Sequence, residues 1–346
     1  MASNMTNSLH FQKGISLVEL LISLALGLIV VAAVGEVFIS NRNTFRAQEA
    51  ISQVQQNARI GIEMLANDIR EAGGNPCGAP IIPAANIITD STTQWWANWQ
   101  TGTLHGYENT EAGPVAIGIQ VGDRVAGTDA IMSLHAIAAC DGNDLVVVSD
   151  HLTGTSDITV QSASHCIKQG DVVLVCDTRR AAIFQASSVD TGARTITHGT
   201  GAVVPGNLAS SLGIDINKLG IVNLVSASFW YIGNNDRGGR SLFRAAMVND
   251  TVEDPPGSGT MKQGFVMQRQ EMADSVTDMQ ITYATRVAGT LSSNFMVATL
   301  VPDWTTAAAA RITLTLNSSN NAGADLKPIS RQYIQVISLR NQEVVQ

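Results

Sequence analysis

Charged and aromatic side chains are scarce in this chain, and basic residues are fewer than acidic ones. Of the 346 residues, 14% are charged and 5% aromatic, with 21 Lys and Arg against 29 Asp and Glu. Phosphate binding needs a basic surplus, so the net charge of −8 excludes a nucleic-acid partner. A hydrophobic content of 45% excludes intrinsic disorder. The 30 glycines, with so few charges, favour a β-rich body with many turns outside the cytoplasm.

Sequence patterns of metal and catalytic sites are also missing. The cysteines do not form C-x-x-C pairs, which argues against a zinc site. The six histidines occur singly, and no G-x-S-x-G, H-E-x-x-H or P-loop pattern occurs. We therefore expect no cofactor, no bound metal and no catalytic residues. The chain is predicted not to be an enzyme.

One long apolar run stands near the N-terminus, and it is the only one of its kind. Residues Ile15–Ile39 have no charged side chain between Leu20 and Gly35. A helix needs roughly 20 apolar residues to cross ~30 Å of hydrocarbon. The run therefore predicts a single membrane anchor, with a large remainder of the chain on one side.

Glu19 is anomalous within this run. A carboxylate there costs about 2.5–3.5 kcal/mol on insertion scales, and an intramembrane acid is a functional-site candidate by default. If the chain were cut after Gly14, Ile15 would carry a free α-amine and Glu19 would be the fifth residue of the mature chain. The carboxylate of one subunit could then pair with the Ile15 ammonium of its neighbour. Both charges would be compensated only in the assembly, which favours polymerisation.

The residues around this junction, Lys13-Gly14-Ile15-Ser16-Leu17-Val18-Glu19-Leu20, resemble the class III signal of type IV pilins and pseudopilins. The resemblance implies cleavage by prepilin peptidase after Gly14 and N-methylation of Ile15. It also implies that Glu19 is the glutamate used in assembly. Two alternatives are a secretory signal cleaved near Val31-Ala32-Ala33 and an uncleaved signal anchor. The acid inside the apolar run argues against the first.

The predicted helix continues beyond the membrane. Apolar residues recur in steps of three and four and form one helical face: Ile51, Val54, Ala58, Ile62, Leu65 and Ile69. No proline occurs between Ile15 and Asn75, whereas Gly73-Gly74 followed by Pro76 is a stop signal. A helix from Ile15 to Ala72 would be ~87 Å long.

After Gly74 the pattern changes to short Val-, Ile- and Thr-rich runs separated by Gly, Asp and Asn, which is typical of strands. These runs are Ala130–Leu134, Leu145–Ser149, Ile158–Gln161, Val172–Cys176, Ala182–Ala186, Thr195–Thr197, Ile221–Ile232, Ser241–Ala246, Met279–Thr285, Arg311–Leu316 and Tyr333–Leu339. Gly201–Gly220 is expected to be a long connection, and Asp254–Thr260 a turn or loop. Three tryptophans, Trp95, Trp96 and Trp99, are expected to form a local core, with an adhesive surface as the alternative.

Several segments resemble the PilW family of minor pilins. They include the helix exit Asn67-Asp68-Ile69-Arg70-Glu71-Ala72-Gly73-Gly74 and the stretches 127–131, 170–177, 183–185, 241–244, 276–283 and 337–341. The resemblance implies an α+β, pilin-like lollipop, with one long N-terminal helix packed on an antiparallel β-rich head. It divides the chain into a leader (1–14), a transmembrane and filament-core half-helix (15–39), a periplasmic half-helix (40–74) and a periplasmic head (75–346).

The same resemblance implies a role in pilus assembly or initiation. The partners would be prepilin peptidase, other minor and major pilins and the inner-membrane assembly platform. The protein would have a single membrane pass and a periplasmic head, and would later enter the pilus, with roles in motility and adhesion. The alternatives are a J-type pseudopilin of a type II secretion system and a membrane-tethered periplasmic binding module or enzyme.

A periplasmic head lies in a compartment where disulfides form. Four cysteines allow three pairings, among Cys77, Cys140, Cys166 and Cys176. We favour Cys166–Cys176, because Gln169-Gly170-Asp171 can reverse the chain between them, which leaves Cys77–Cys140. One bridge with two buried thiols is the alternative.

Overall fold

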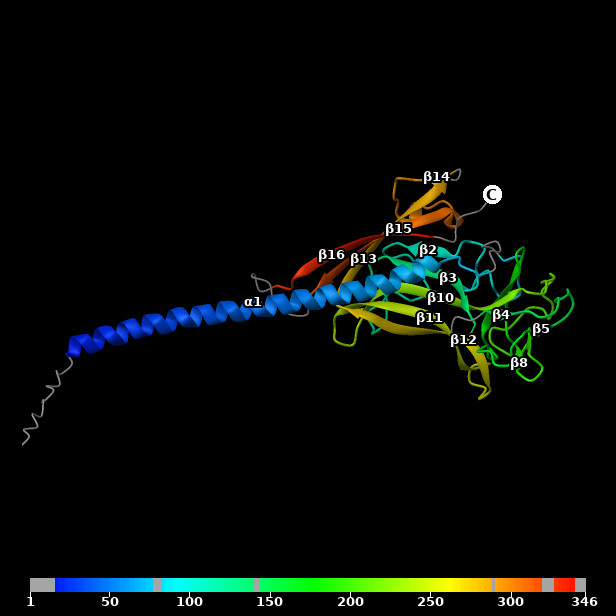
Figure 1. Ribbon diagram of the computed structural model, residues 1–346, viewed down its shortest axis with the longest axis horizontal. Helices are drawn as coiled ribbons and strands as arrows, with labels where there is room; N and C mark the ends of the chain where they lie inside the picture. Colours follow the sequence, from blue (N-terminus) through cyan, green and yellow to red (C-terminus); the bar gives the residue numbers. More distant parts are fainter. Residues whose placement is uncertain (1–15, 77–82, 140–143, 288–289, 319–326, 340–346) are drawn as a thin grey trace, which may run out of the picture.

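The computed structural model describes residues 16–76, 83–139, 144–287, 290–318 and 327–339. A single helix, α1 (Leu17–Glu71), has 55 residues and is therefore about 82 Å long. Its first half projects free of the rest of the molecule, and its second half lies along a β-rich head (Figure 1). The α+β, pilin-like fold expected from the sequence is confirmed.

The head-bound half of α1 uses the predicted apolar face. Val54, Ala58, Leu65 and Ile69 are buried. The helix ends at Glu71, and Gly73 follows with a positive φ of 75°, a conformation that glycine adopts without steric cost. The stop signal read from the sequence is therefore confirmed.

The first of three sheets is built around the long strand β10 (Ile221–Asn234). On one side β10 pairs with β11 (Arg240–Glu253), which pairs with β12 (Met261–Asp274). On its other side lie β3 (Ala130–Ala138) and β4 (Leu145–Val146). The remaining strands of this sheet are β1 (Ala85–Asn86), β2 (Leu104–Tyr107), β6 (Val172–Cys176) and β7 (Ala181–Gln185). Its pairs are antiparallel except for β1 with β7.

The second sheet has the order β14-β13-β15-β16. Its strands are β13 (Val276–Val287), β14 (Thr290–Leu291), β15 (Ala307–Asn317) and β16 (Ser330–Ser338). Two 3₁₀ turns, η1 (Ala298–Leu300) and η2 (Trp304–Thr306), lie between β14 and β15. A third, small sheet contains β5 (Asp157–Thr159), β8 (Ser188–Asp190) and β9 (Thr195–Thr197).

The hydrophobic core has three parts, of which two contain core residues predicted from the sequence. The first packs α1 against both larger sheets and includes Leu65, Trp230 and Ile312. The second contains Trp96 and Trp99, which pack against residues of the first sheet such as Phe229. The predicted local tryptophan core is confirmed, and because Trp96 and Trp99 are buried, they do not form an adhesive surface.

All eleven predicted strand runs overlap an observed strand, but β1, β2, β8, β12 and β14 were not predicted, and β12 is the longest of these. Val266 is the only β-branched residue of β12, and much of the strand is polar. It is a strand because a long hairpin pairs it with β11 from Ser241↔Asp274 to Glu253↔Met261. The turn predicted at Asp254–Thr260 is the loop of this hairpin. Tertiary pairing has therefore outweighed the local preference.

We predict that Leu65→Ala lowers the free energy of unfolding by about 2–5 kcal/mol, because it leaves a cavity between α1 and the head. Leu65 is fully buried, whereas its neighbour Met64 is 42% exposed. The matched control Met64→Ala should change stability by less than about 1 kcal/mol. Urea unfolding of the full chain in detergent measures both, and equal losses would contradict the described packing.

Candidate functional site

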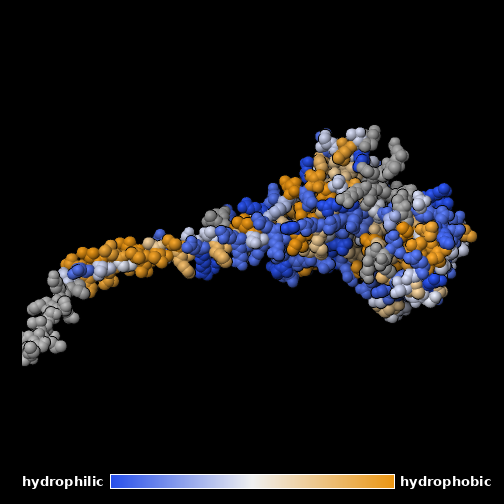
Figure 2. Space-filling model, viewed as in Figure 1, coloured by the Kyte–Doolittle hydropathy of each residue, from blue (hydrophilic) through white to orange (hydrophobic). Residues whose placement is uncertain are grey.

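The free half of α1 presents apolar side chains on every face. Each large hydrophobic residue from Leu17 to Ile39 is 50–76% exposed. The most apolar stretch of α1 has a mean hydropathy of 2.7, and none of it is buried in the chain. Figure 2 shows this surface as largely apolar, with a hydrophilic stretch between it and the head. Each such side chain gains about 1.5–3 kcal/mol on burial, so this half-helix requires lipid or protein around it.

Polar side chains within and next to the apolar segment are compatible with a lipid environment. The Ser23 hydroxyl donates to the Leu20 carbonyl at 2.9 Å, so it needs no partner outside the helix. Beyond Ile39, Arg42 and Arg46 are exposed and stand one turn apart. Arginines at this position can reach lipid headgroups while the apolar segment stays in hydrocarbon.

Glu19 lies in the first turn of α1 on its exposed surface. The amino end of a helix stabilises a negative charge, but only modestly. Among the described residues, no ion pair involves Glu19. The predicted processing residues Gly14 and Ile15 lie outside the described residues, so cleavage between them and the pairing of the Ile15 amine with the Glu19 of a neighbour stay predictions.

Asp68 fixes the second half of α1 to the head. Its Oδ2 accepts hydrogen bonds from Ser228 Oγ (2.8 Å), Trp230 Nε1 (2.7 Å) and Arg244 Nε (2.9 Å). The Arg244 guanidinium also lies over the Trp230 ring, 5.9 Å from its centroid. On the neighbouring strand, Ser133 Oγ donates to the Asp68 carbonyl at 2.7 Å. One helical residue thus joins β3, β10 and β11, which fixes the rotation of the helix against the head.

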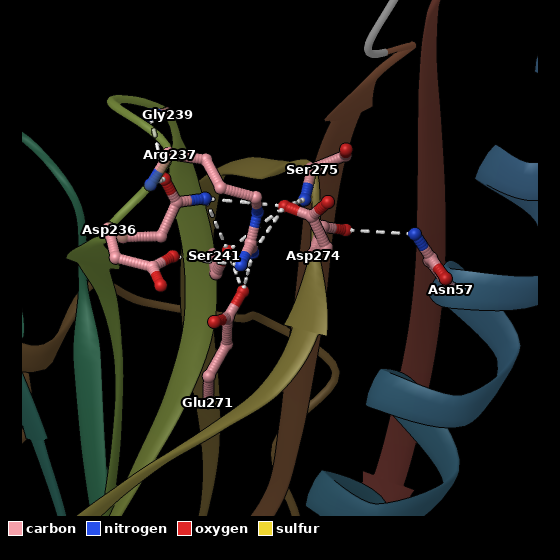
Figure 3. Close-up of polar contacts among 9 residues, drawn as sticks. Asn57, Asp236, Arg237, Gly239, Ser241, Glu271, Asp274 and Ser275 are labelled. Carbon is pink, nitrogen blue, oxygen red and sulfur yellow. Dashed lines mark hydrogen bonds and ion pairs between the residues drawn. The ribbon is translucent and has the colours of Figure 1, made fainter.

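A second polar contact lies closer to the membrane half of α1, where Asn57 Nδ2 donates to the Asp274 carbonyl at 3.2 Å (Figure 3). The Asp274 carboxylate accepts from Ser275 N (2.7 Å) and forms an ion pair with Arg237 (3.2 Å). Arg237 also binds Glu271. These hydrogen bonds, to Glu271 above all, raise the pKa of Arg237 above its ordinary value.

The contacts of Asn57 and Asp68 with the head lie on the same side of α1. Asn57 and Asp68 are 11 residues apart, which is about three helical turns and about 16 Å. They therefore lie on one face of α1. Two separated contacts on a single face fix the tilt of a helix as well as its rotation. The orientation of the head follows that of α1.

The disulfide pattern differs from the expected one. Cys176 ends β6, is buried and is disulfide-bonded, whereas Cys166 is exposed and is not bonded to it. The chain reverses at Lys168–Asp171, before the start of β6, and about 16 Å of extended chain separates Asp171 from Cys176. A disulfide needs Cα atoms within about 7 Å. The predicted Cys166–Cys176 bond is therefore wrong, and Cys77 and Cys140 lie outside the described residues.

The sequence analysis did not identify Asp68 as a residue that fixes α1 to the head. Asp68 directly precedes the predicted core residue Ile69. An acid at the margin of the buried helix face could have indicated a polar contact between α1 and the head. Its partners Trp230 and Arg244 are more than 160 residues away in sequence. Within the described residues, no group of three or more His, Cys, Asp or Glu side chains could hold a metal ion.

Two buried histidines meet at the third sheet. His198 follows β9 and is fully buried, and its ring centroid lies 5.2 Å from that of His151. Phe184 packs on its other side at 5.1 Å. Burial, with a smaller contribution from His151, lowers the pKa of His198 to about 4, although Asp157 opposes this shift. The fold therefore holds His198 neutral.

The N-terminal segment is similar to a known protein family. Residues 9–35 match the prokaryotic N-terminal methylation motif. The match includes Gly14, Ile15 and Glu19. No curated protein matches the chain. The motif and the exposed apolar helix together support a membrane-anchored, type IV pilin-like or pseudopilin protein that prepilin peptidase processes.

We predict that Asp68→Asn lowers the free energy of unfolding by about 2 kcal/mol, because Arg244 loses its counter-ion and the hydrogen bonds lose their charge. The control Glu63→Gln breaks only the exposed Arg59–Glu63 pair of the same helix. It should change stability by less than about 1 kcal/mol. Denaturant unfolding of the two variants measures the difference, and equal effects would contradict the locking role of Asp68.

We also predict that His198 alone accounts for a loss of about 3 kcal/mol of stability as the pH falls from 6.5 to 4, because the unfolded chain protonates His198 in this window and the folded chain does not. His198→Gln should remove this contribution and leave those of His105 and His135, whose pKa values burial also lowers. Unfolding at pH 8 measures the packing cost of the substitution separately. An unchanged slope between pH 6.5 and 4 in the variant would contradict the assignment.

Proposed function

We propose that this protein is a minor pilin of a type IV pilus, of the PilW type, which assembles through α1. The observation that carries the proposal is the methylation motif, residues 9–35, which extends into a helix whose apolar stretch has no buried residue. Before assembly the anchor holds the protein in the inner membrane, with the head in the periplasm. After assembly the protein is part of the pilus at the cell surface.

Assembly moves α1 from lipid into a bundle of similar helices. Lipid tails and neighbouring helices are both apolar, so the transfer leaves the burial of residues such as Leu24 and Val31 nearly unchanged. The carboxylate of Glu19 gains most, because it exchanges an uncompensated position in the membrane for an ion pair with the Ile15 amine of a neighbour. The charge pair therefore sets the axial position of each subunit, and the apolar contacts hold it there.

Assembly, and not catalysis, is the proposed work of the head. Two open pockets flank α1, with volumes of about 250 and 280 Å³. Small and amide side chains make up most of their linings, among them Ala136, Asn223 and Gln53. Prepilin peptidase, the assembly platform and other pilins are the proposed partners.

A J-type pseudopilin of a type II secretion system would carry the same motif and a similar helix. Deletion of the gene separates the two proposals, because a minor pilin should be needed for pili and a pseudopilin for protein secretion. Loss of secretion with normal pili would replace our proposal with this one.

We predict that Glu19→Ala leaves cleavage after Gly14 intact but lowers the amount of protein in sheared pili by about tenfold or more, since the Ile15 amine would then be buried without a counter-ion. The matched control is Glu36→Ala, which removes an exposed acid near the other end of the same apolar segment. That variant should enter pili normally. Immunoblots of membrane and pilus fractions measure both steps.

Normal incorporation of the Glu19→Ala variant would contradict the proposed pairing. An equal loss for Glu19→Ala and Glu36→Ala would also contradict it, because any acid of the segment would then serve. A failure of cleavage in wild-type protein would overturn the minor pilin assignment itself.

A further inference from the structure

Strand β16 is an unprotected edge of the second sheet. Within the described residues it pairs only with β15, and the sheet order ends with it. An edge strand has unpaired N–H and C=O groups, to which another extended segment can bind. In natural proteins such edges usually carry protective features, such as charged side chains, prolines or bulges.

The hydrogen bonds that flank β16 show which of its backbone groups are open. Leu339 N donates to Ala308 O, and Ser318 N donates to Ile329 O, both at 2.9 Å. Hydrogen-bonded positions alternate along an antiparallel pair, so the odd-numbered residues of β16 bond to β15. The N–H and C=O groups of Gln332, Ile334 and Val336 therefore point away from the sheet.

The usual protection is missing here. The pairing of β15 with β16 runs from Ala309↔Ser338 to Asn317↔Ser330 without a bulge. The strand has no proline, and Arg331 is its only charged residue. Ile334 and Val336 are 65% and 53% exposed. Their side chains and their open backbone groups thus form one continuous surface.

Strand β12, at the edge of the first sheet, is a useful comparison. It carries four charged residues, Lys262, Arg269, Glu271 and Asp274, and its pairing with β11 is interrupted by a bulge. Such features discourage strand addition. β16 therefore lacks the protection that β12 has.

The position of β16 limits what can bind to it. The strand runs alongside α1 (Figure 1), and Ile337 belongs to the core that α1 shares with the second sheet. Ser330 pairs with Asn317, whose N–H donates to Ser275 O beside the Asn57 contact. β16 therefore starts at the membrane-facing end of the head and runs in the same direction as α1.

This direction excludes the simplest self-association. Antiparallel pairing of two β16 strands about a two-fold axis would point the two α1 helices in opposite directions. Both helices could not then enter the same membrane from the same side. A subunit that binds by antiparallel pairing must therefore present a different strand while its own helix stays parallel to α1.

We propose that β16 binds an extended, uncharged segment of a neighbouring pilin-like subunit, which adds a strand to the second sheet through main-chain hydrogen bonds. The inference rests on the proposed function. Apolar side chains at alternate positions of the added segment cover Ile334 and Val336. Because β16 packs on α1, the added strand joins the heads of two subunits beside the helices that join their filament halves.

The experiment uses the full chain in piliated cells, with the photocrosslinking residue p-benzoylphenylalanine in place of Ile334. We expect an adduct with a second protein that carries an N-terminal methylation motif, with the crosslinked peptide in an extended segment. Adding Val336→Pro should reduce the adduct about tenfold, because it removes an outward N–H that β15 does not use. The same crosslinker in place of Leu208, which is 66% exposed elsewhere on the head, is the control.

Absence of an adduct, an adduct with a protein that lacks the motif, or an unchanged yield with Val336→Pro would overturn the proposal. If Val336→Pro fails to accumulate, Gln332→Pro removes a second outward N–H and serves in its place. The N-terminus is sequenced in the same samples. Processing at Ile15 without an adduct refutes strand addition alone, whereas an unprocessed N-terminus refutes the proposed function.

Discussion

The first half of α1 packs against nothing in the described part of the chain, and the rest of the structure depends on this constraint. Its large side chains, from Leu17 to Ile39, are all at least half exposed. Water is therefore a poor environment for this half-helix, and both suitable alternatives, lipid and a bundle of like helices, lie outside the chain. The apolar side chains of this half-helix are therefore buried only in a membrane or in an assembly.

The head is attached so that it follows the helix. Asp68 joins α1 to three strands of the first sheet, and Asn57 contacts the turn that leads into the second sheet. Because these contacts lie on one face of α1, any position that α1 takes in a bundle determines where the head points. The open edge of β16 then faces a defined direction beside the helix, and strand addition there would connect neighbouring heads.

Local signals in the sequence predicted the parts of the fold that depend on local chemistry. The apolar run, the spacing from Ile51 to Ile69 and the Gly73-Gly74 stop signal gave the helix and its end. Pairing between distant segments was harder to predict. Strand β12 exists because of its hairpin partner, and the Asp68 lock joins residues far apart in sequence. The predicted Cys166–Cys176 bond failed because a turn in the chain does not by itself bring two side chains together.

The account depends most on the ammonium group that would pair with Glu19. Intact mass measurement and N-terminal sequencing of the protein extracted from membranes test it directly. The account predicts a mature chain that begins with N-methylated Ile15. A chain that begins at any other residue, or that keeps its first 14 residues, would contradict it, because Glu19 would then have no neighbouring amine to pair with.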